Sequence, residues 1–200
     1  SSKTGPPQAG FYPDFGTRHA DNRRAPPPAL QSHAMHSIDS AADVLRLADL
    51  GFEAPALLLA RHGLILHRVA DGAPIPGSYW GDPEAGVIGS TVYARADTPV
   101  HSLLHEACHL LVLPPERRAA VHTDATDCDH EEDATCYLQI LLAGQLPGVG
   151  QARLMADMDA WGYSFRLGST AGWFAHDAAD ARAWLAERNL LPVGHTRICA

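Results

Sequence analysis

The sequence VHSLLHEACHLLVL, residues 100–113, decides the fold of this chain. Its leucine, valine and alanine residues recur at the spacing of a helix that is buried on most sides. Thr98 and Pro99 are typical of an N-cap followed by a first-turn proline, and Pro114 is a strong signal for the end of a helix. We therefore predict a buried helix over residues 100–113.

Within this helix, residues 105–109 read His-Glu-Ala-Cys-His, an HExxH motif. His105 and His109 would lie one helical turn apart on the same face, so both imidazoles can bind one zinc ion. Glu106 would project about 100° around the helix and could face a water molecule on that ion. Zinc lowers the pKa of such a water, and a carboxylate can accept its proton and pass it to a leaving amine. The motif predicts His105 and His109 as zinc ligands and Glu106 as general base and acid.

A catalytic zinc site usually has a third protein ligand. A metzincin-like third histidine is excluded, because Pro115 occupies the position six residues beyond His109. The remaining candidates lie in an acidic stretch that leads into a second predicted helix, residues 131–143. They are Asp124, Asp127, Asp129, His130, Glu131, Glu132 and Asp133.

The faces of the second helix favour one of these candidates. Glu131 shares an apolar face with Leu138 and Leu141, whereas Glu132 shares a more polar face with Cys136 and Gln139. Because a ligand must point inward toward the first helix, we prefer Glu131 as the third ligand. Glu132 and the other acids of the stretch stay open as alternatives.

Residues 131–142, EEDATCYLQILL, together with the HExxH motif, resemble the gluzincins and, more narrowly, the ImmA/IrrE-type metallopeptidases. In that family a ligand glutamate precedes an Ala-Asn pair, an aromatic residue and a double leucine. With Glu131 as that glutamate, Ala134, Tyr137 and the leucines at 141–142 fall in register, while Thr135 replaces the asparagine. The resemblance covers residues 101–143. It implies hydrolysis of peptide bonds in a peptide or protein substrate.

Two further expectations concern that reaction. Zinc peptidases commonly use a tyrosine, histidine or arginine to stabilise the oxyanion, and we select Tyr163 from Tyr137, Tyr163, Arg166 and His176. In gluzincins an edge strand beside the metal-binding helix pairs with extended substrates, so the resemblance implies that role for a strand predicted over residues 87–94.

The rest of the chain predicts an α+β fold, with a small, mostly antiparallel sheet packed on the two metal-binding helices. Residues 1–37 form a Pro/Gly-rich arm, and residues 38–200 form the metallopeptidase domain. Within the domain we expect a helix from residue 39 or 40 to Gly51 and a hairpin of residues 56–60 and 64–69. Two later helices are expected over residues 151–160 and 177–188, with a loop over 162–174 between them.

Composition limits the partners of the chain. The net charge of −8 excludes nucleic acid and anionic membrane surfaces as expected partners, and no apolar run is long enough to span a membrane. Four scattered cysteines and the lack of an apolar leader lead us to expect a cytoplasmic protein. The arm could contact the active-site cleft as a pro-segment. The alternative to an enzyme is a non-catalytic metal-binding protein that serves regulation or recognition.

Overall fold

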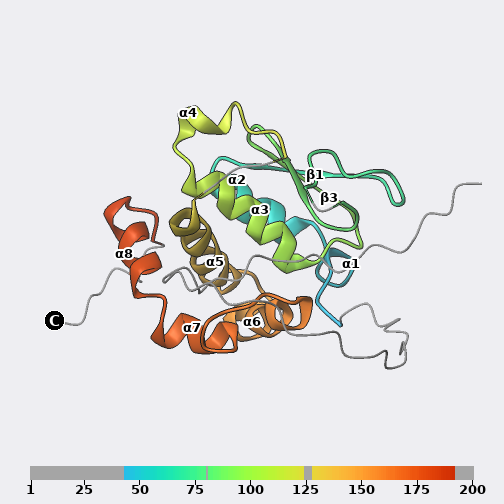
Figure 1. Ribbon diagram of the computed structural model, residues 1–200. Coiled ribbons are helices and arrows are strands. Elements are labelled where there is room, and N and C mark those ends of the chain that lie inside the picture. The colour runs from blue at the N-terminus through green and yellow to red at the C-terminus, as the bar shows by residue number, and fades with distance from the viewer. Residues whose placement is uncertain (1–42, 80, 124–127, 192–200) are drawn as a thin grey trace, which may run out of the picture.

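A computed structural model describes residues 43–79, 81–123 and 128–191. The helix predicted over residues 100–113 is α3 (Val100–Val112), and it lies at the centre of the fold (Figure 1). All of its residues are buried, because the sheet packs on one side of α3 and helices α5 and α6 pack on another. The residue that caps α3 is Pro99 rather than Thr98, whose hydroxyl accepts a hydrogen bond from the backbone N–H of Arg95 at 3.0 Å.

The sheet contains β1 (Ile65–Arg68), β2 (Gly86–Ile88) and β3 (Thr91–Ala94) in the order β1-β3-β2. β1 is parallel to β3, and β2 is antiparallel to it. The sheet is therefore mixed, and the prediction of a mostly antiparallel sheet is corrected. The strand predicted over residues 87–94 is divided by a tight turn at Gly89, whose φ of +58° suits glycine.

The prediction of a strand over residues 56–60, the first arm of the hairpin, is wrong, because these residues belong to helix α2 (Glu53–Arg61). Alanine and leucine fill this run, and both are strong helix formers. A five-residue apolar run has no periodicity that separates a buried strand from a helix. With α2 in place of a strand, β1 loses its antiparallel partner and pairs only with β3 in the described sheet.

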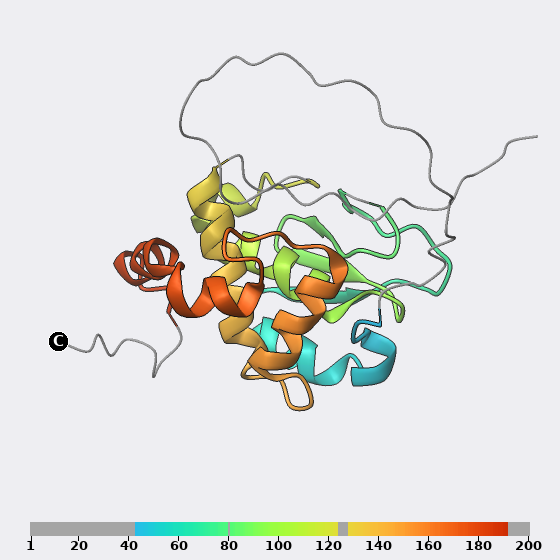
Figure 2. The same ribbon diagram turned by 60° about the horizontal axis from the view of Figure 1, so that its bottom comes forward.

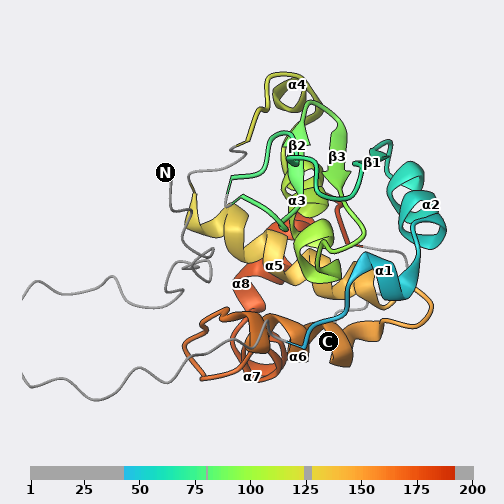
Figure 3. The same ribbon diagram turned by 90° about the vertical axis from the view of Figure 1, so that its right-hand side faces the viewer.

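The remaining helices surround α3. They are α1 (Leu47–Leu50), α4 (Pro115–Arg118), α5 (Asp129–Ala143), α6 (Gly150–Trp161), α7 (Thr170–His176) and α8 (Ala179–Glu187). α5 packs against α3, α6 and α8. Figure 2 shows α6 in orange beside α5, and Figure 3 shows α3 and α5 lying between the sheet and the α6–α7 region.

Most of the later helix predictions are confirmed. α5, α6 and α8 match the predicted helices, whereas the loop predicted over residues 162–174 contains the start of α7, capped by the Ser169 hydroxyl. Only α1 is helical within the described part of the first predicted helix. The arm over residues 1–37 lies outside the described residues. Among the helices that are described, none is both long and apolar enough to cross a bilayer.

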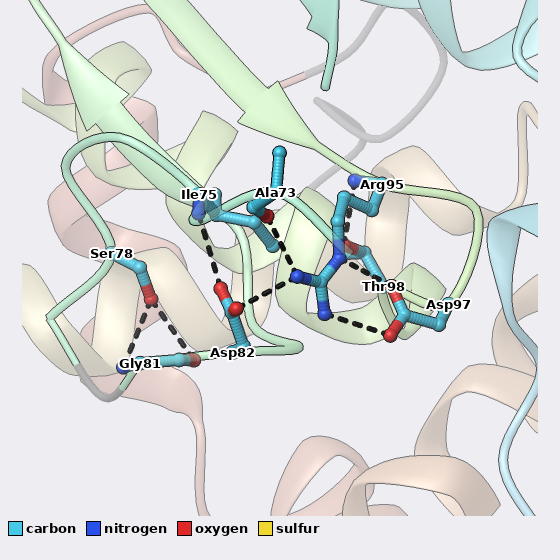
Figure 4. A network of polar contacts seen from close by, with 8 residues as sticks. All are labelled: Ala73, Ile75, Ser78, Gly81, Asp82, Arg95, Asp97 and Thr98. Carbon is cyan, nitrogen blue, oxygen red and sulfur yellow. Dashed lines mark hydrogen bonds and ion pairs between the residues drawn. The ribbon is translucent and has the colours of Figure 1, made fainter. Parts of the chain in front are cut away.

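A buried arginine holds the long loop between β1 and β2 against the start of α3 (Figure 4). Arg95 Nη1 donates to the backbone oxygen of Ala73 and to Asp82 Oδ2, both at 2.7 Å. Its Nε and Nη2 donate to the two carboxylate oxygens of Asp97 at 2.9 and 2.8 Å. We call Arg95, Asp82 and Asp97 the arginine clamp. Beyond it, the backbone N–H of Ala85 donates to Ser102 Oγ at 3.0 Å, which joins the loop to α3.

Candidate metal centre

Three predicted metal-ligand candidates meet where α3 faces α5. His105 and His109 lie one turn apart on α3, and their Nε2 atoms are 3.0 Å apart. Glu132, in the first turn of α5, places Oε1 3.2 Å from His105 Nε2 and Oε2 3.4 Å from His109 Nε2. One ligand atom from each residue lies within 4.8 Å of the other two. We call these three residues the His-His-Glu cluster.

The cluster has the donor atoms and the spacing for a zinc ion. In a tetrahedral site with bonds of about 2.0–2.1 Å, two ligand atoms lie about 3.3 Å apart. The observed separations of 3.0, 3.2 and 3.4 Å are close to that value. Two imidazole nitrogens and one carboxylate also form a ligand set that leaves a fourth position for water or substrate. The residues present therefore fit a catalytic-type zinc site.

The charges in the cluster favour binding of a cation. Burial would raise the pKa of Glu132, but the two imidazoles lower it to about 2, so the carboxylate stays ionised. Burial would also lower the pKa of His105, but the charge and hydrogen bond of Glu132 raise it above 6.5. Burial and the charge of His105 lower the pKa of His109 to about 4. His109 is therefore neutral at neutral pH and keeps a lone pair on one of its ring nitrogens.

The structure brings Glu132, and not the preferred Glu131, to the two histidines. Glu131 points away and lies 3.5 Å from Arg117 Nη1 of α4. Our preference relied on an inward-facing apolar stripe, but α5 is buried on every side from Ala134 to Ala143. An apolar neighbour therefore does not identify the side of α5 that faces α3. The informative signal was the polar stripe that Glu132 shares with Gln139.

Two buried polar residues of α5 contact the far sides of the imidazoles. Gln139 Oε1 lies 3.2 Å from His105 Nδ1, and Thr135 Oγ1 lies 3.4 Å from His109 Nδ1. Gln139 Nε2 donates to the sulfur of Met158 on α6 at 3.0 Å. Both α5 side chains are fully buried. Such partners orient metal-binding imidazoles and tune their affinity.

The two residues predicted to act in catalysis are buried near His105. Glu106 is buried, and its charge helps to raise the pKa of His105. Tyr163, which follows α6, packs its ring nearly perpendicular to that of His105, with the centroids 5.8 Å apart. Proximity to the cluster is thus observed for both, while their chemical roles stay predictions.

Two buried groups near the cluster were missed by the sequence reasoning. Glu84 accepts a hydrogen bond from Trp161 Nε1 at 3.2 Å, and its charge also raises the pKa of His105. His101 lies one turn before His105, packs against the ring of Trp161, and finds no hydrogen-bond partner among the residues described. For His101 the signal was its four-residue spacing from His105, whereas the sequence contains no comparable signal for Glu84.

None of the contacts described for the other oxyanion candidates involves the cluster. Tyr137 stacks on Phe174 with the centroids 4.6 Å apart. Arg166 forms an ion pair with Asp177 at the surface, and His176 is exposed at the end of α7.

Of the other acidic-stretch candidates, Asp129 and His130 are exposed, and Asp133 is partly buried outside the three-residue group. Burial is the main cause that raises the pKa of Asp133 to about 6. Asp124 and Asp127 lie outside the described residues.

The resemblance implied that an extended substrate pairs with the strand over residues 87–94. At Val87, however, the backbone at the outer edge of β2 is already hydrogen-bonded within the chain. The Val87 N–H donates to the Gly77 oxygen at 3.1 Å, and the Val87 oxygen accepts from the Thr123 N–H at 3.1 Å. The chain itself therefore occupies this edge, which corrects the expectation for residues 87–94.

Comparison with known proteins does not extend these observations. No family model, no curated protein and no solved structure matches the chain. The site is therefore interpreted from its own geometry and charge.

Proposed function

We propose that the protein is a zinc-dependent metallopeptidase of the gluzincin type, in which His105, His109 and Glu132 hold the metal. The observation that carries this proposal is the spacing of 3.0–3.4 Å among their ligand atoms. The second support is the buried carboxylate of Glu106, which follows the first ligand directly in the HExxH motif. A structural zinc site would need neither an open fourth position nor a neighbouring base.

Bound zinc would supply Lewis-acid chemistry, polarising a substrate carbonyl and making a water molecule more acidic. Glu106 would serve as general base and acid, accepting a proton from a water molecule at this site and delivering it to the leaving amine. Glu132 remains an anionic ligand throughout, because its pKa of about 2 keeps it ionised at neutral pH. Tyr163, packed on His105, donates a hydrogen bond to the developing oxyanion.

The test separates metal binding from catalysis with Glu106→Gln. We expect this variant to retain zinc at one equivalent per chain, because Glu106 is not a ligand. Cleavage of a defined peptide library, followed by mass spectrometry, should fall by about 10²–10⁴-fold, the usual contribution of a general base. Glu131→Gln is the matched control and should retain both zinc and cleavage.

Equal cleavage by wild type and Glu106→Gln would overturn the peptidase proposal. Stoichiometric zinc in a wild-type protein that cleaves no member of the library would instead support the alternative, a metal-binding protein for regulation or recognition. Absence of zinc binding would remove both.

A further inference from the structure

The amide of Gln139 lies between a metal-ligand candidate on α3 and a thioether on α6. We infer that Met158 and Gln139 are positioning residues that fix the tautomer of His105, so that Nδ1 carries the proton and Nε2 offers its lone pair to a metal. The inference deepens the proposed function and uses its metal site. Its chemical basis is nevertheless independent of any ion.

The first step is the orientation of the amide. A primary amide has an accepting carbonyl end and a donating NH₂ end, and a thioether sulfur has no proton to donate. The end of Gln139 that faces Met158 at 3.0 Å must therefore be the NH₂ group. The reverse orientation would turn the carbonyl oxygen of a fully buried amide toward a sulfur that cannot donate to it.

The second step follows from the first. With its NH₂ group on Met158, Gln139 presents Oε1 to His105 Nδ1 at 3.2 Å. A carbonyl oxygen accepts only, so Nδ1 must be the protonated nitrogen of the ring. In a neutral imidazole Nε2 then carries the lone pair, and this is the nitrogen that faces Glu132 and His109.

The third step distinguishes the two histidines. Glu132, Thr135 and Gln139 lie three and four residues apart, so they form one stripe along two turns of α5. Thr135 contacts His109 Nδ1 at 3.4 Å, but a hydroxyl can donate or accept and so selects neither tautomer. The amide of Gln139 therefore selects one tautomer of His105, because only one of its orientations satisfies its hydrogen bonds. The hydroxyl of Thr135 can pair with either tautomer of His109.

The experiment reads the His105 ring directly by ¹⁵N NMR of the full chain without metal, at an alkaline pH where the imidazole is neutral, alongside a zinc titration. Wild type should show Nδ1 protonated. Gln139→Leu should show a mixture of tautomers and bind zinc about 10–100-fold more weakly, the usual cost of losing such a partner. Met158→Leu removes only the weak sulfur acceptor and should cost about threefold.

Gln139→Glu is the rescue variant, since it keeps an accepting oxygen toward Nδ1. It should retain the wild-type tautomer and stay within about threefold of wild-type zinc affinity. Gln145→Leu, at an exposed position after α5, is the matched control and should change neither readout.

The inference is overturned if folded Gln139→Leu keeps the wild-type tautomer, or if wild type itself has Nε2 protonated. The NMR readout needs no metal. If wild type binds no zinc but Gln139→Leu still loses the Nδ1–H tautomer, the proposed function fails while this inference stands.

Discussion

The arginine clamp and the His-His-Glu cluster are both polar groups packed against α3, but they are satisfied in opposite ways. In the clamp each donating nitrogen of Arg95 has a carboxylate or carbonyl oxygen within 3.0 Å, and both of its acidic partners are about half exposed. In the cluster two imidazole nitrogens face one carboxylate and also each other at 3.0 Å. The clamp is complete within the described chain, whereas the cluster directs two imidazole nitrogens and one carboxylate at one point, where a cation could bind.

This difference separates a buried polar group that serves the fold from one that could hold a metal ion. A structural network matches each donor to an acceptor, and removing one member costs folding free energy. A metal site instead gathers acceptors, which repel one another until a cation binds. The two groups should therefore respond oppositely to mutation: metal affinity should depend on the cluster, and stability without metal should depend on the clamp.

The largest expected effect is on zinc affinity, when Glu132 is replaced by glutamine. The substitution removes the anionic ligand. A structural zinc site gains about 10–16 kcal/mol from four ligands, and losing about a quarter of that energy should weaken zinc binding on the order of 100- to 1000-fold. Competition with a chromophoric chelator measures the change. The unfolding free energy of the zinc-free protein, measured at an alkaline pH where both imidazoles are neutral, should change by less than about 1 kcal/mol, because the variant then loses no ion pair and still fills the same space.

Glu131→Gln is the matched control for that experiment. It changes the neighbouring residue in the same way, but Glu131 contacts only a half-exposed arginine in the described structure, at 3.5 Å. Such surface pairs contribute about 0–1 kcal/mol. If Glu131→Gln lost zinc and Glu132→Gln retained it, the sequence-based choice of ligand would be correct and the cluster would not be the metal site.

The clamp should give the converse result with Arg95→Met. Methionine keeps the apolar stem but leaves the Ala73 oxygen and the two carboxylates without their donor. We expect a loss of about 2–3 kcal/mol in the unfolding free energy, moderated by the solvent exposure of Asp82 and Asp97. Urea unfolding in the presence of a chelator measures it. Zinc affinity should stay within about twofold of wild type, and a loss comparable to that of Glu132→Gln would remove the distinction between the two groups.

The sequence could predict the parts of the cluster that depend on local spacing, but not the part that depends on tertiary packing. The HExxH spacing determines that His105 and His109 share a helical face, and the strong apolar pattern around them identifies α3. Those features are local, and they are confirmed. The identity of the third residue depends on how α5 is rotated against α3, which is tertiary information. Because α5 is buried on every side from Ala134 to Ala143, its apolar pattern could not report that rotation.

Other features depend on still longer-range contacts. Residues 56–60 form part of a helix that packs beside β1, and a five-residue apolar run has no periodicity that separates such a helix from a buried strand. The clamp joins Ala73, Asp82 and Arg95, which no spacing rule connects. The order and direction of the strands follow from these contacts, so an α+β class was predictable and a mixed sheet was not.

The smallest expected effect concerns His101, the third histidine on the stripe of α3 that carries the cluster. Burial, followed by the positive charges of His105 and Arg46, lowers its pKa to about 3. Because this pKa lies below the 6.5 of an unperturbed histidine, the unfolded chain binds a proton that the folded chain rejects. The stability that His101 contributes is therefore complete above pH 6.5 and is lost as the pH falls toward 3.

His101→Phe should remove that acid sensitivity while keeping an aromatic ring against Trp161. The expected difference is about 1.4 kcal/mol per pH unit below the pKa of the unfolded histidine, or about 2 kcal/mol at pH 5. Urea unfolding of zinc-free protein at neutral pH and near pH 5 gives the slope, and His67→Phe, an exposed histidine that contacts Tyr93, is the control. Because His109 and Glu132 are present in both proteins, their titration largely cancels in the comparison. Equal slopes for wild type and His101→Phe would show that His101 accepts a proton in the folded state, and it would then belong with the titrating histidines of the cluster rather than with the neutral core.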